Sequence, residues 1–230
     1  MPRYALYFSP EPDDPWSLAG DHWLGRDVAK NQALPQPVIA GLTLAQMHGL
    51  TINARRYGFH ATLKAPFHLT DACDIAQLDS ALARFCTAQA GFTIPSPRVQ
   101  WMGNFLALLP YATCPEINTL ALHCMRHFAR FSAPLSASEL ARRNTPALSP
   151  RQQELLLQWG YPYTEEEFRF HMTLSDAQKD LGSALSTLLH DAATRHFSIA
   201  EPLRVSSIAL FRETAPGDDF ELLNHYRFGS

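Results

Sequence analysis

The sequence predicts an α+β protein with two pseudo-symmetric lobes, largely antiparallel sheets, helices on the outside and a cleft between the lobes. Three observations support this fold class. The strand motif Phe-His-x-Thr-Leu occurs twice in the chain. An amphipathic helix, a short Phe-Thr-Ile or Phe-Ser-Ile strand and a hairpin follow each copy in the same order. Hairpin connections are typical of antiparallel sheets.

The repeated order also predicts the domain organisation. We expect one bilobal domain over residues 1–230, in which the lobe with the first motif covers about 50–131 and the lobe with the second covers about 149–230. Residues 1–49 would contribute an N-terminal strand and a helix. Residues 132–148 are rich in Ser, Ala, Pro and Arg, and we interpret them as the connection between the two halves.

Several elements of the first half have clear sequence signals. Side-chain character alternates along residues 3–8, and the segment is rich in aromatic residues. Both features predict a strand. The first motif lies in a predicted strand at about 57–65. Apolar spacing predicts a helix after it, capped at Gly91; its stripe is Ile75, Leu78, Leu82, Phe85 and Cys86. A turn at 103–104 predicts a hairpin, and residues 115–130 are expected to be helical.

The second half repeats this pattern. Ser149-Pro150-Arg151-Gln152 has the form of a capping box with Pro at the first helical position, and Gly160 would end the helix. The second motif lies in a predicted strand at 168–175. A helix is expected next through Leu181, Leu185, Leu188 and Leu189. Two longer strands, at about 204–212 and 219–228, would close the chain.

Composition limits the classes of function. Hydrophobic residues make up 46% and charged residues 18% of the 230 residues, which is an ordinary globular balance. A net charge of −3 predicts no strongly basic surface, so we expect a small phosphorylated substrate rather than an extended nucleic acid. The four cysteines show no disulfide or CxxC spacing, and no apolar run approaches the ~18 residues of a membrane span. The expected location is the cytoplasm; the oligomeric state is left open.

The bare pattern His-x-Ser/Thr is a weak signal, because four matches occur among ten histidines. They are His60/Thr62, His68/Thr70, His171/Thr173 and His196/Ser198. We interpret two of them as chance matches. Thr70 would cap the following helix, and His196 lies near a predicted helix C-terminus, where a cation complements the helix dipole.

The other two matches share their flanking residues. The first reads Tyr-Gly-Phe-His-Ala-Thr-Leu at 57–63 and the second Phe-Arg-Phe-His-Met-Thr-Leu at 168–174. Because side chains alternate along a strand, the flanking apolar residues would face the core. His60 with Thr62, and His171 with Thr173, would share the opposite face. A matched polar pair on two otherwise buried strands indicates an active site rather than two separate structural histidines.

These residue types fit the hydrolysis of a cyclic phosphodiester. One imidazole can take a proton from the attacking water, while the other protonates the departing oxygen. The hydroxyls of Thr62 and Thr173 would donate to non-bridging phosphate oxygens. This scheme needs no metal and no cofactor.

The alternation of side chains along a strand predicts three cations on the same face as the motif histidines, where they would bind the substrate. Arg56 and Lys64 have the parity of His60, and Arg169 has the parity of His171. They could bind phosphate oxygens, or they could be solvent-facing charges at strand ends. Arg142-Arg143 in the connecting segment could also reach the substrate.

Taken together, these residues resemble the two-histidine phosphoesterase superfamily, which includes RNA ligases and cyclic phosphodiesterases. More narrowly, the segments at 55–69 and 148–174 resemble a bacterial family associated with phosphonate metabolism. The resemblance covers essentially the whole chain. It implies a phosphoric diester hydrolase of the cyclic phosphodiesterase type, which acts on a small ribose- or nucleotide-type substrate in phosphonate breakdown. It also implies that His60, Thr62, His171 and Thr173 form the catalytic HxTx motifs.

Three alternatives stay open at this point. His123 and His127 are spaced as two metal ligands on one helix face, although the sequence offers no obvious third ligand. The chain could instead be a non-catalytic protein that binds a phosphorylated ligand. It could also join RNA ends with the same residues in the manner of a ligase.

Overall fold

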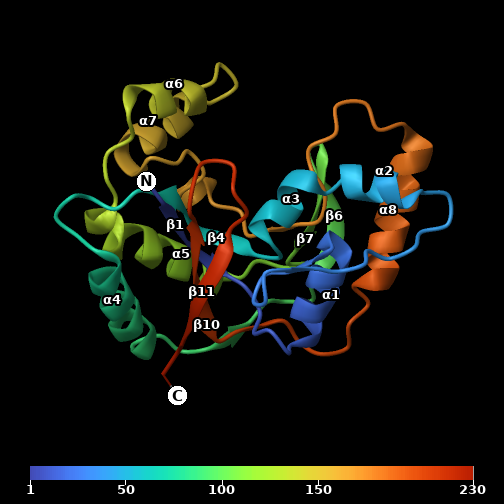
Figure 1. Cartoon of the computed structure of the whole chain (residues 1–230), viewed down its shortest axis with the longest axis horizontal. Coiled ribbons are helices and arrows are strands. Elements are labelled where there is room, and N and C mark those ends of the chain that lie inside the picture. Colours follow the sequence, from blue (N-terminus) through green and yellow to red (C-terminus); the bar gives the residue numbers. More distant parts are fainter. Residues whose placement is uncertain (230) are drawn as a thin grey trace.

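The computed structural model describes residues 1–229, which form a mixed arrangement of helices and antiparallel sheets (Figure 1). All neighbouring strands among these residues pair antiparallel. The predicted fold class, α+β with largely antiparallel sheets, is therefore confirmed. Within the same residues, no helix combines the length and the apolar character that crossing a membrane requires.

The larger sheet has four strands in the order β11–β10–β1–β4. Its strands are β1 (Arg3–Phe8), β4 (Ala61–Phe67), β10 (Ser207–Glu213) and β11 (Glu221–Arg227). The alternating sequence of β1 places Tyr4, Leu6 and Phe8 in the main hydrophobic core. Ala5 and Tyr7, on the other face, belong to a second, smaller cluster.

The second sheet has three strands in the order β6–β7–β8. Here β6 (Arg98–Met102) and β7 (Phe105–Leu109) form the predicted hairpin, and β8 (Met172–Thr173) pairs with β7. Two minor pairs complete the sheets: β2 (Arg26–Asp27) with β3 (Gln32–Ala33), and β5 (Phe92–Thr93) with β9 (Arg204–Val205).

The two hairpins are exchanged between the two halves of the chain. The hairpin β6–β7 follows the first motif in sequence, yet it pairs with β8, the strand of the second motif. The hairpin β10–β11 follows the second motif, yet β10 pairs with β1, which in turn pairs with β4 of the first motif. Figure 1 therefore shows blue, teal and red strands in one sheet. The sheets do not follow the ranges 50–131 and 149–230, and the division into one bilobal domain stays a prediction.

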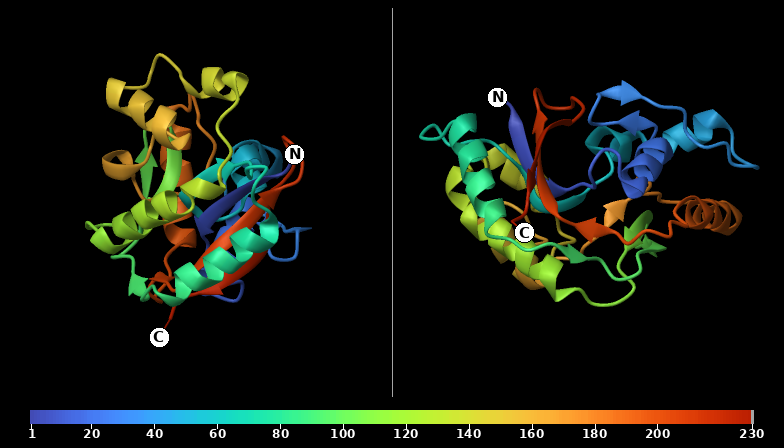
Figure 2. Two further views of the ribbon diagram at one scale, coloured as in Figure 1. Left: turned by 90° about the vertical axis from the view of Figure 1, so that its left-hand side faces the viewer. Right: turned by 90° about the horizontal axis from the view of Figure 1, so that it is seen from below.

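Helices flank both sheets (Figure 2). The helix α4 packs against β11, α5 against β4 and α8 against β6. Their apolar stripes are buried in one continuous core. The helices are α1 (Pro15–Leu24), α2 (Leu44–Gly49), α3 (Ile52–Tyr57), α4 (Ile75–Thr87), α5 (Pro115–His127), α6 (Ala137–Arg143), α7 (Pro150–Trp159) and α8 (Ser183–His196), with 3₁₀ turns η1 (Ala129–Phe131) and η2 (Glu165–Glu167).

The predicted caps have mixed outcomes. The box at Ser149 is confirmed, because its side chain accepts a hydrogen bond from the Gln152 amide and Gly160 ends α7 in the left-handed region. The cap predicted for α4 at Gly91 is wrong, since the helix ends at Thr87 and Ala88 is its C-cap residue. Thr70 does not cap this helix either, because Asp74 makes the capping box with the third helical residue.

The boundaries of the motif strands also differ from the predictions. Of the strand predicted at about 57–65, Tyr57 belongs to α3 and residues 58–60 form a short connection. The strand β4 begins at Ala61 and continues through Pro66. A proline is tolerated there because β4 is an edge strand, where a missing N–H breaks no ladder. Of the strand predicted at 168–175, only Met172–Thr173 is paired. The Phe-Ser-Ile segment at 197–199 is not a strand, because Phe197 caps α8.

Candidate active site

Burial along both motifs alternates as predicted. Phe59, Ala61 and Leu63 are at most 4% exposed, and so are Phe170, Met172 and Leu174. The histidine and threonine of each copy lie between these core residues and keep partial access to solvent. The predicted division of each motif into a core face and a polar face is therefore confirmed.

Backbone geometry fixes the orientation of His60. Its Nδ1 donates a hydrogen bond to the carbonyl oxygen of Gly58 at 2.9 Å. The second ring nitrogen, Nε2, lies 3.5 Å from the hydroxyl of Thr62. Gly58 has φ 76° and ψ 178°, a region that essentially only glycine adopts, and a Cβ there would lie 2.2 Å from Val28. Glycine at this position therefore lets the carbonyl oxygen hold the imidazole.

His171 is held in the same way. Its Nδ1 donates to the carbonyl oxygen of Arg169 at 2.8 Å, again two residues earlier in the chain. Its ring lies 5.6 Å from that of Phe105 on β7, the strand that pairs with β8. In both motifs the backbone bond leaves Nε2 as the unprotonated nitrogen of the neutral ring, free to accept a proton.

A positive charge on His171 acts on the ring of His60. Burial lowers the pKa of His60 to about 4; the hydrogen bond to Gly58 opposes this shift, and the charge of His171 adds to it. Burial also lowers the pKa of His171, opposed by the hydrogen bond to Arg169. This contribution to the lowered pKa of His60 comes from a residue 111 positions later in the sequence. Both rings are neutral at pH 7 in the free protein.

Two tyrosine rings lie near His60, and no local sequence pattern predicts the first of them, Tyr7. The ring of Tyr7 on β1 stacks on His60 with 3.9 Å between centroids, and Tyr7 pairs with Thr62 in the sheet. The ring of Tyr57, at the end of α3, lies 6.0 Å from His60 and stacks on Phe220. Only the pairing of β1 with β4 reveals Tyr7, and this pairing is a property of the tertiary fold.

Of the predicted substrate-binding cations, two are bound to other groups. Arg56 lies in α3 rather than in a strand, and its guanidinium binds Glu213 and the carbonyl oxygen of Asp218. The parity argument therefore does not apply to Arg56. Arg169 is exposed, and its guanidinium donates to the carbonyl oxygens of Glu166 and Phe168. The role of both residues in binding substrate stays a prediction.

Lys64 is displaced by a bulge in β4. Thr62 pairs with Tyr7 and Lys64 pairs with Leu6, so β4 advances by two residues while β1 advances by one. Lys64 therefore shares the face of Leu6, and the prediction that it lies on the face of His60 is wrong because the parity count runs straight through the bulge. Its side chain still reaches the same cavity as Thr62, because both lie at the open edge of β4.

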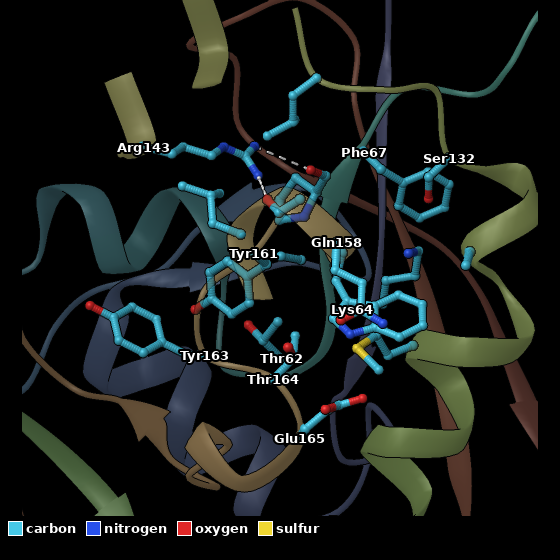
Figure 3. Close-up of a pocket in the computed structure, with 18 of the residues that line it drawn as sticks. Thr62, Lys64, Phe67, Ser132, Arg143, Gln158, Tyr161, Tyr163, Thr164 and Glu165 are labelled. Carbon is cyan, nitrogen blue, oxygen red and sulfur yellow. Dashed lines mark hydrogen bonds between the residues drawn. The ribbon is translucent and has the colours of Figure 1, made fainter. Parts of the chain in front are cut away.

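A cavity of about 390 Å³ adjoins Thr62 at this open edge (Figure 3). Its walls come from β4, from α5, from the connecting segment 132–148, and from α7 with the residues that follow it up to 168. Arg143 at the end of α6 donates to the carbonyl oxygens of Gly160 and Pro66, so it ties α7 and β4 together. The sequence suggested Arg143 as a residue that could reach the substrate but did not locate it. The structure places it in the cavity wall.

The remaining histidines have other surroundings. His68 binds the carbonyl oxygen of Pro2, and His196 ends α8 as predicted, with its Nε2 against the carbonyl oxygen of Ala19. His123 and His127 lie in α5, where the ring of His127 packs against Phe85. Across residues 1–229, no three His, Cys, Asp or Glu side chains are grouped as a metal site requires.

Comparisons with known proteins give one family and two relatives. A family model described as "Protein of unknown function (DUF1045)" matches residues 62–221. A protein of Janthinobacterium sp. (strain Marseille) named ribose 1,5-bisphosphate phosphokinase PhnN is 43% identical over 223 residues, and one of the same name from Laribacter hongkongensis (strain HLHK9) is 33% identical over 220 residues. Each alignment covers 96% of this chain but only 49% and 50% of the relatives, so the chain spans about half of their length.

Among solved structures, a chain described as "Crystal structure of phosphoesterase" aligns with a TM-score of 0.44 and 14% sequence identity. The alignment covers 99% of this chain and 98% of the other.

Proposed function

Because the chain belongs to the DUF1045 family, whose description gives no activity, we propose its function from its own residues. We propose a metal-independent phosphoesterase that opens a cyclic phosphate, or hydrolyses a phosphodiester, of a small ribose- or nucleotide-type substrate. The observation that carries the proposal is the matched pair of motif histidines. Each is held through Nδ1 by the carbonyl oxygen two residues earlier, beside a threonine on the same face.

The proposed reaction uses the free Nε2 of each ring. One neutral imidazole takes a proton from water as the water oxygen bonds to phosphorus. The bond from phosphorus to the departing ester oxygen breaks, and the other ring, protonated, gives its proton to that oxygen. The hydroxyls of Thr62 and Thr173 donate to the non-bridging oxygens, where negative charge develops. One proton enters the pair from water and one leaves with the departing oxygen. The two histidines therefore end with their protonation states exchanged.

Burial distinguishes the two histidines. His60 has the more strongly lowered pKa, to about 4, and stacks on the buried ring of Tyr7. When the pair holds one proton, the ring with the lower pKa is the neutral one, so it is the ring available to accept a proton from water. We therefore assign His60 as the base and His171 as the acid, whose protonation the negative charge of a bound phosphate would favour.

The names of the relatives support the substrate class more than the reaction. A kinase needs a site for the phosphates of a nucleotide, and the P-loop motif G-x-x-x-x-G-K-[ST] does not occur in this sequence. The nearest match, Gly20 to Asp27, begins inside α1 and has Arg26 in place of the lysine. We infer that the kinase name belongs to the half of those relatives outside the alignment. A ribose phosphate substrate and a role in phosphonate breakdown fit both the names and the resemblance.

A substrate screen tests the proposal. Nucleoside 2′,3′-cyclic phosphates and ribose cyclic phosphates are incubated with the wild type, His60→Ala and His171→Ala in the presence of a chelator. We expect hydrolysis of at least one compound, and a loss of kcat of ~10²–10⁴-fold in each variant with binding largely spared. His68→Ala is the matched control, because this histidine also precedes a threonine by two residues but lies outside the site.

Two results would contradict the proposal. Activity that appears only after a metal is added would rule out the mechanism. Binding of cyclic phosphates without turnover, unchanged in both histidine variants, would instead identify a non-catalytic phospho-ligand protein.

A further inference from the structure

The cavity beside Thr62 contains polar groups that have no partner within the described part of the chain. Ser132 Oγ, Trp159 Nε1 and Thr164 Oγ1 are shielded from solvent and make no hydrogen bond there. All three residues line this one cavity. Buried polar atoms are almost always paired in folded proteins, because an unpaired one costs about 1–3 kcal/mol. Their gathering in one cavity indicates a site for a ligand with several hydrogen-bonding groups.

Lys64 adds a buried positive charge to the same cavity. Lys64 is 7% exposed. Among residues 1–229, no carboxylate lies within 4 Å of its ammonium group. The ammonium lies 4.9 Å from the ring centre of Phe67. Burial lowers the pKa of Lys64 to about 8, so it is still mostly protonated at pH 7. A buried ammonium without an anion is unfavourable, and a bound anion would relieve this.

The other charges in the wall leave the cavity positive. Its acidic residue, Glu165, is engaged by Arg126 at 3.2 Å and Arg151 at 2.9 Å. Arg143 contributes a second cation on the side of the cavity opposite Lys64 (Figure 3). An anionic ligand is therefore favoured over a neutral or cationic one.

Thr62 connects the cavity to the proposed catalytic pair. Its side chain lines the cavity, and its hydroxyl lies 3.5 Å from Nε2 of His60. Figure 3 shows Thr62 beside Thr164, with the ring of Tyr161 above them. A substrate whose phosphorus lies at His60 would extend past Thr62 into the cavity. A volume of about 390 Å³ is at the small end of ligand pockets and suits a monosaccharide phosphate.

We propose that this cavity is the specificity pocket of the proposed phosphoesterase and selects sugars that carry a second phosphate. Lys64 binds this phosphate monoester, which is separate from the reacting phosphodiester. Ser132, Trp159 and Thr164 bind hydroxyl and ester oxygens of the sugar. The inference rests on the proposed function for its reaction, and on the cavity residues for its ligand.

Matched substrates test the pocket through turnover. Ribose cyclic phosphates with and without a phosphate on O5 are compared for the wild type, Lys64→Met and the control Lys179→Met, which alters an exposed lysine. We expect the wild type and Lys179→Met to favour the phosphorylated substrate in kcat/KM by about 10–100-fold, the value of one or two charge-assisted hydrogen bonds. In Lys64→Met this ratio should fall close to 1. An unchanged ratio in Lys64→Met would overturn the proposal.

A binding measurement separates failure of the pocket from failure of the reaction. Ribose 5-phosphate should raise the Tm of the wild type and of the inactive variant H60Q/H171Q, whereas ribose should not. Lys64→Met should fold, because it removes an unpaired buried charge, and its Tm should not respond to ribose 5-phosphate. A Tm response that is absent from the wild type, or equal in Lys64→Met, would overturn the pocket whatever the turnover experiments show.

Discussion

Each motif histidine is held by the carbonyl oxygen two residues before it, and this bond determines which nitrogen can take part in chemistry. The carbonyl oxygen can only accept, so Nδ1 carries the proton in the neutral ring and Nε2 is left to accept one. At Gly58 the sequence hints at this arrangement, because a glycine two residues before a strand histidine allows an unusual backbone. At Arg169 no such signal exists.

The pH dependence of activity follows from these two rings. The proposed reaction needs one neutral and one protonated imidazole, and the pKa of each is lowered, that of His60 to about 4. The free enzyme with one of the two rings protonated is therefore most populated between about pH 4 and the pKa of His171. This second pKa lies below the ordinary value of 6.5. We expect kcat/KM to peak on the acid side of pH 6.5 and to fall as pH rises through neutrality. A rate profile with its maximum above pH 7 would contradict this assignment.

Among the elements, β4 shows most clearly how tertiary structure modifies a sequence pattern. Its first residues keep the alternation that the motif predicts, and the bulge before Lys64 then reverses the alternation. The bulge arises from the pairing with β1, so it cannot be read from β4 alone. The strand also continues through Pro66, because its outer edge pairs with no other strand among residues 1–229.

Glu213, the last residue of β10, joins three elements near the site. Its carboxylate is buried and binds Arg3 on β1 and Arg56 on α3. We expect Glu213→Gln to lower the free energy of unfolding by roughly 2–3 kcal/mol, because it leaves two partly buried guanidinium groups without their anion. The measurement is urea denaturation at pH 7.

The matched control for this prediction is Glu221→Gln. Glu221 pairs with Arg212 on the surface, so its loss should cost less than about 1 kcal/mol. Equal losses in the two variants would show that the buried network does not hold β1, β10 and α3 together.

On the scale of the whole molecule, the sheets combine strands from both halves of the chain. The hairpin, the helices α4, α5 and α7 and the polar face of each motif could be predicted, because local spacing and caps determine them. The choice of partner strand could not, since a hairpin carries no local record of the strand it will join. The same limit explains Tyr7, which reaches His60 only through the pairing of β1 with β4.

The cavity was also beyond prediction from sequence. Its polar groups come from separate points of the chain and share no periodic pattern: Ser132 begins the connection, Trp159 ends α7 and Thr164 precedes η2. The sequence predicted residues 132–148 as a connection, and α6 within it folds over the open edge of β4 together with α7, which follows it. The result is a wall whose chemistry becomes visible only when burial and hydrogen bonds are known.

The central claim is that His60 and His171 act as one catalytic unit, and a double-mutant cycle in kcat tests it most directly. On the best cyclic phosphate substrate, His60→Ala and His171→Ala are measured singly and together, with chelator present. We predict a loss of ~10²–10⁴-fold for each single variant and little further loss, within about tenfold, for the double variant, because the second group has no step to perform once its partner is gone. A double variant whose loss equals the product of the two single losses, or single variants with wild-type turnover, would contradict the account.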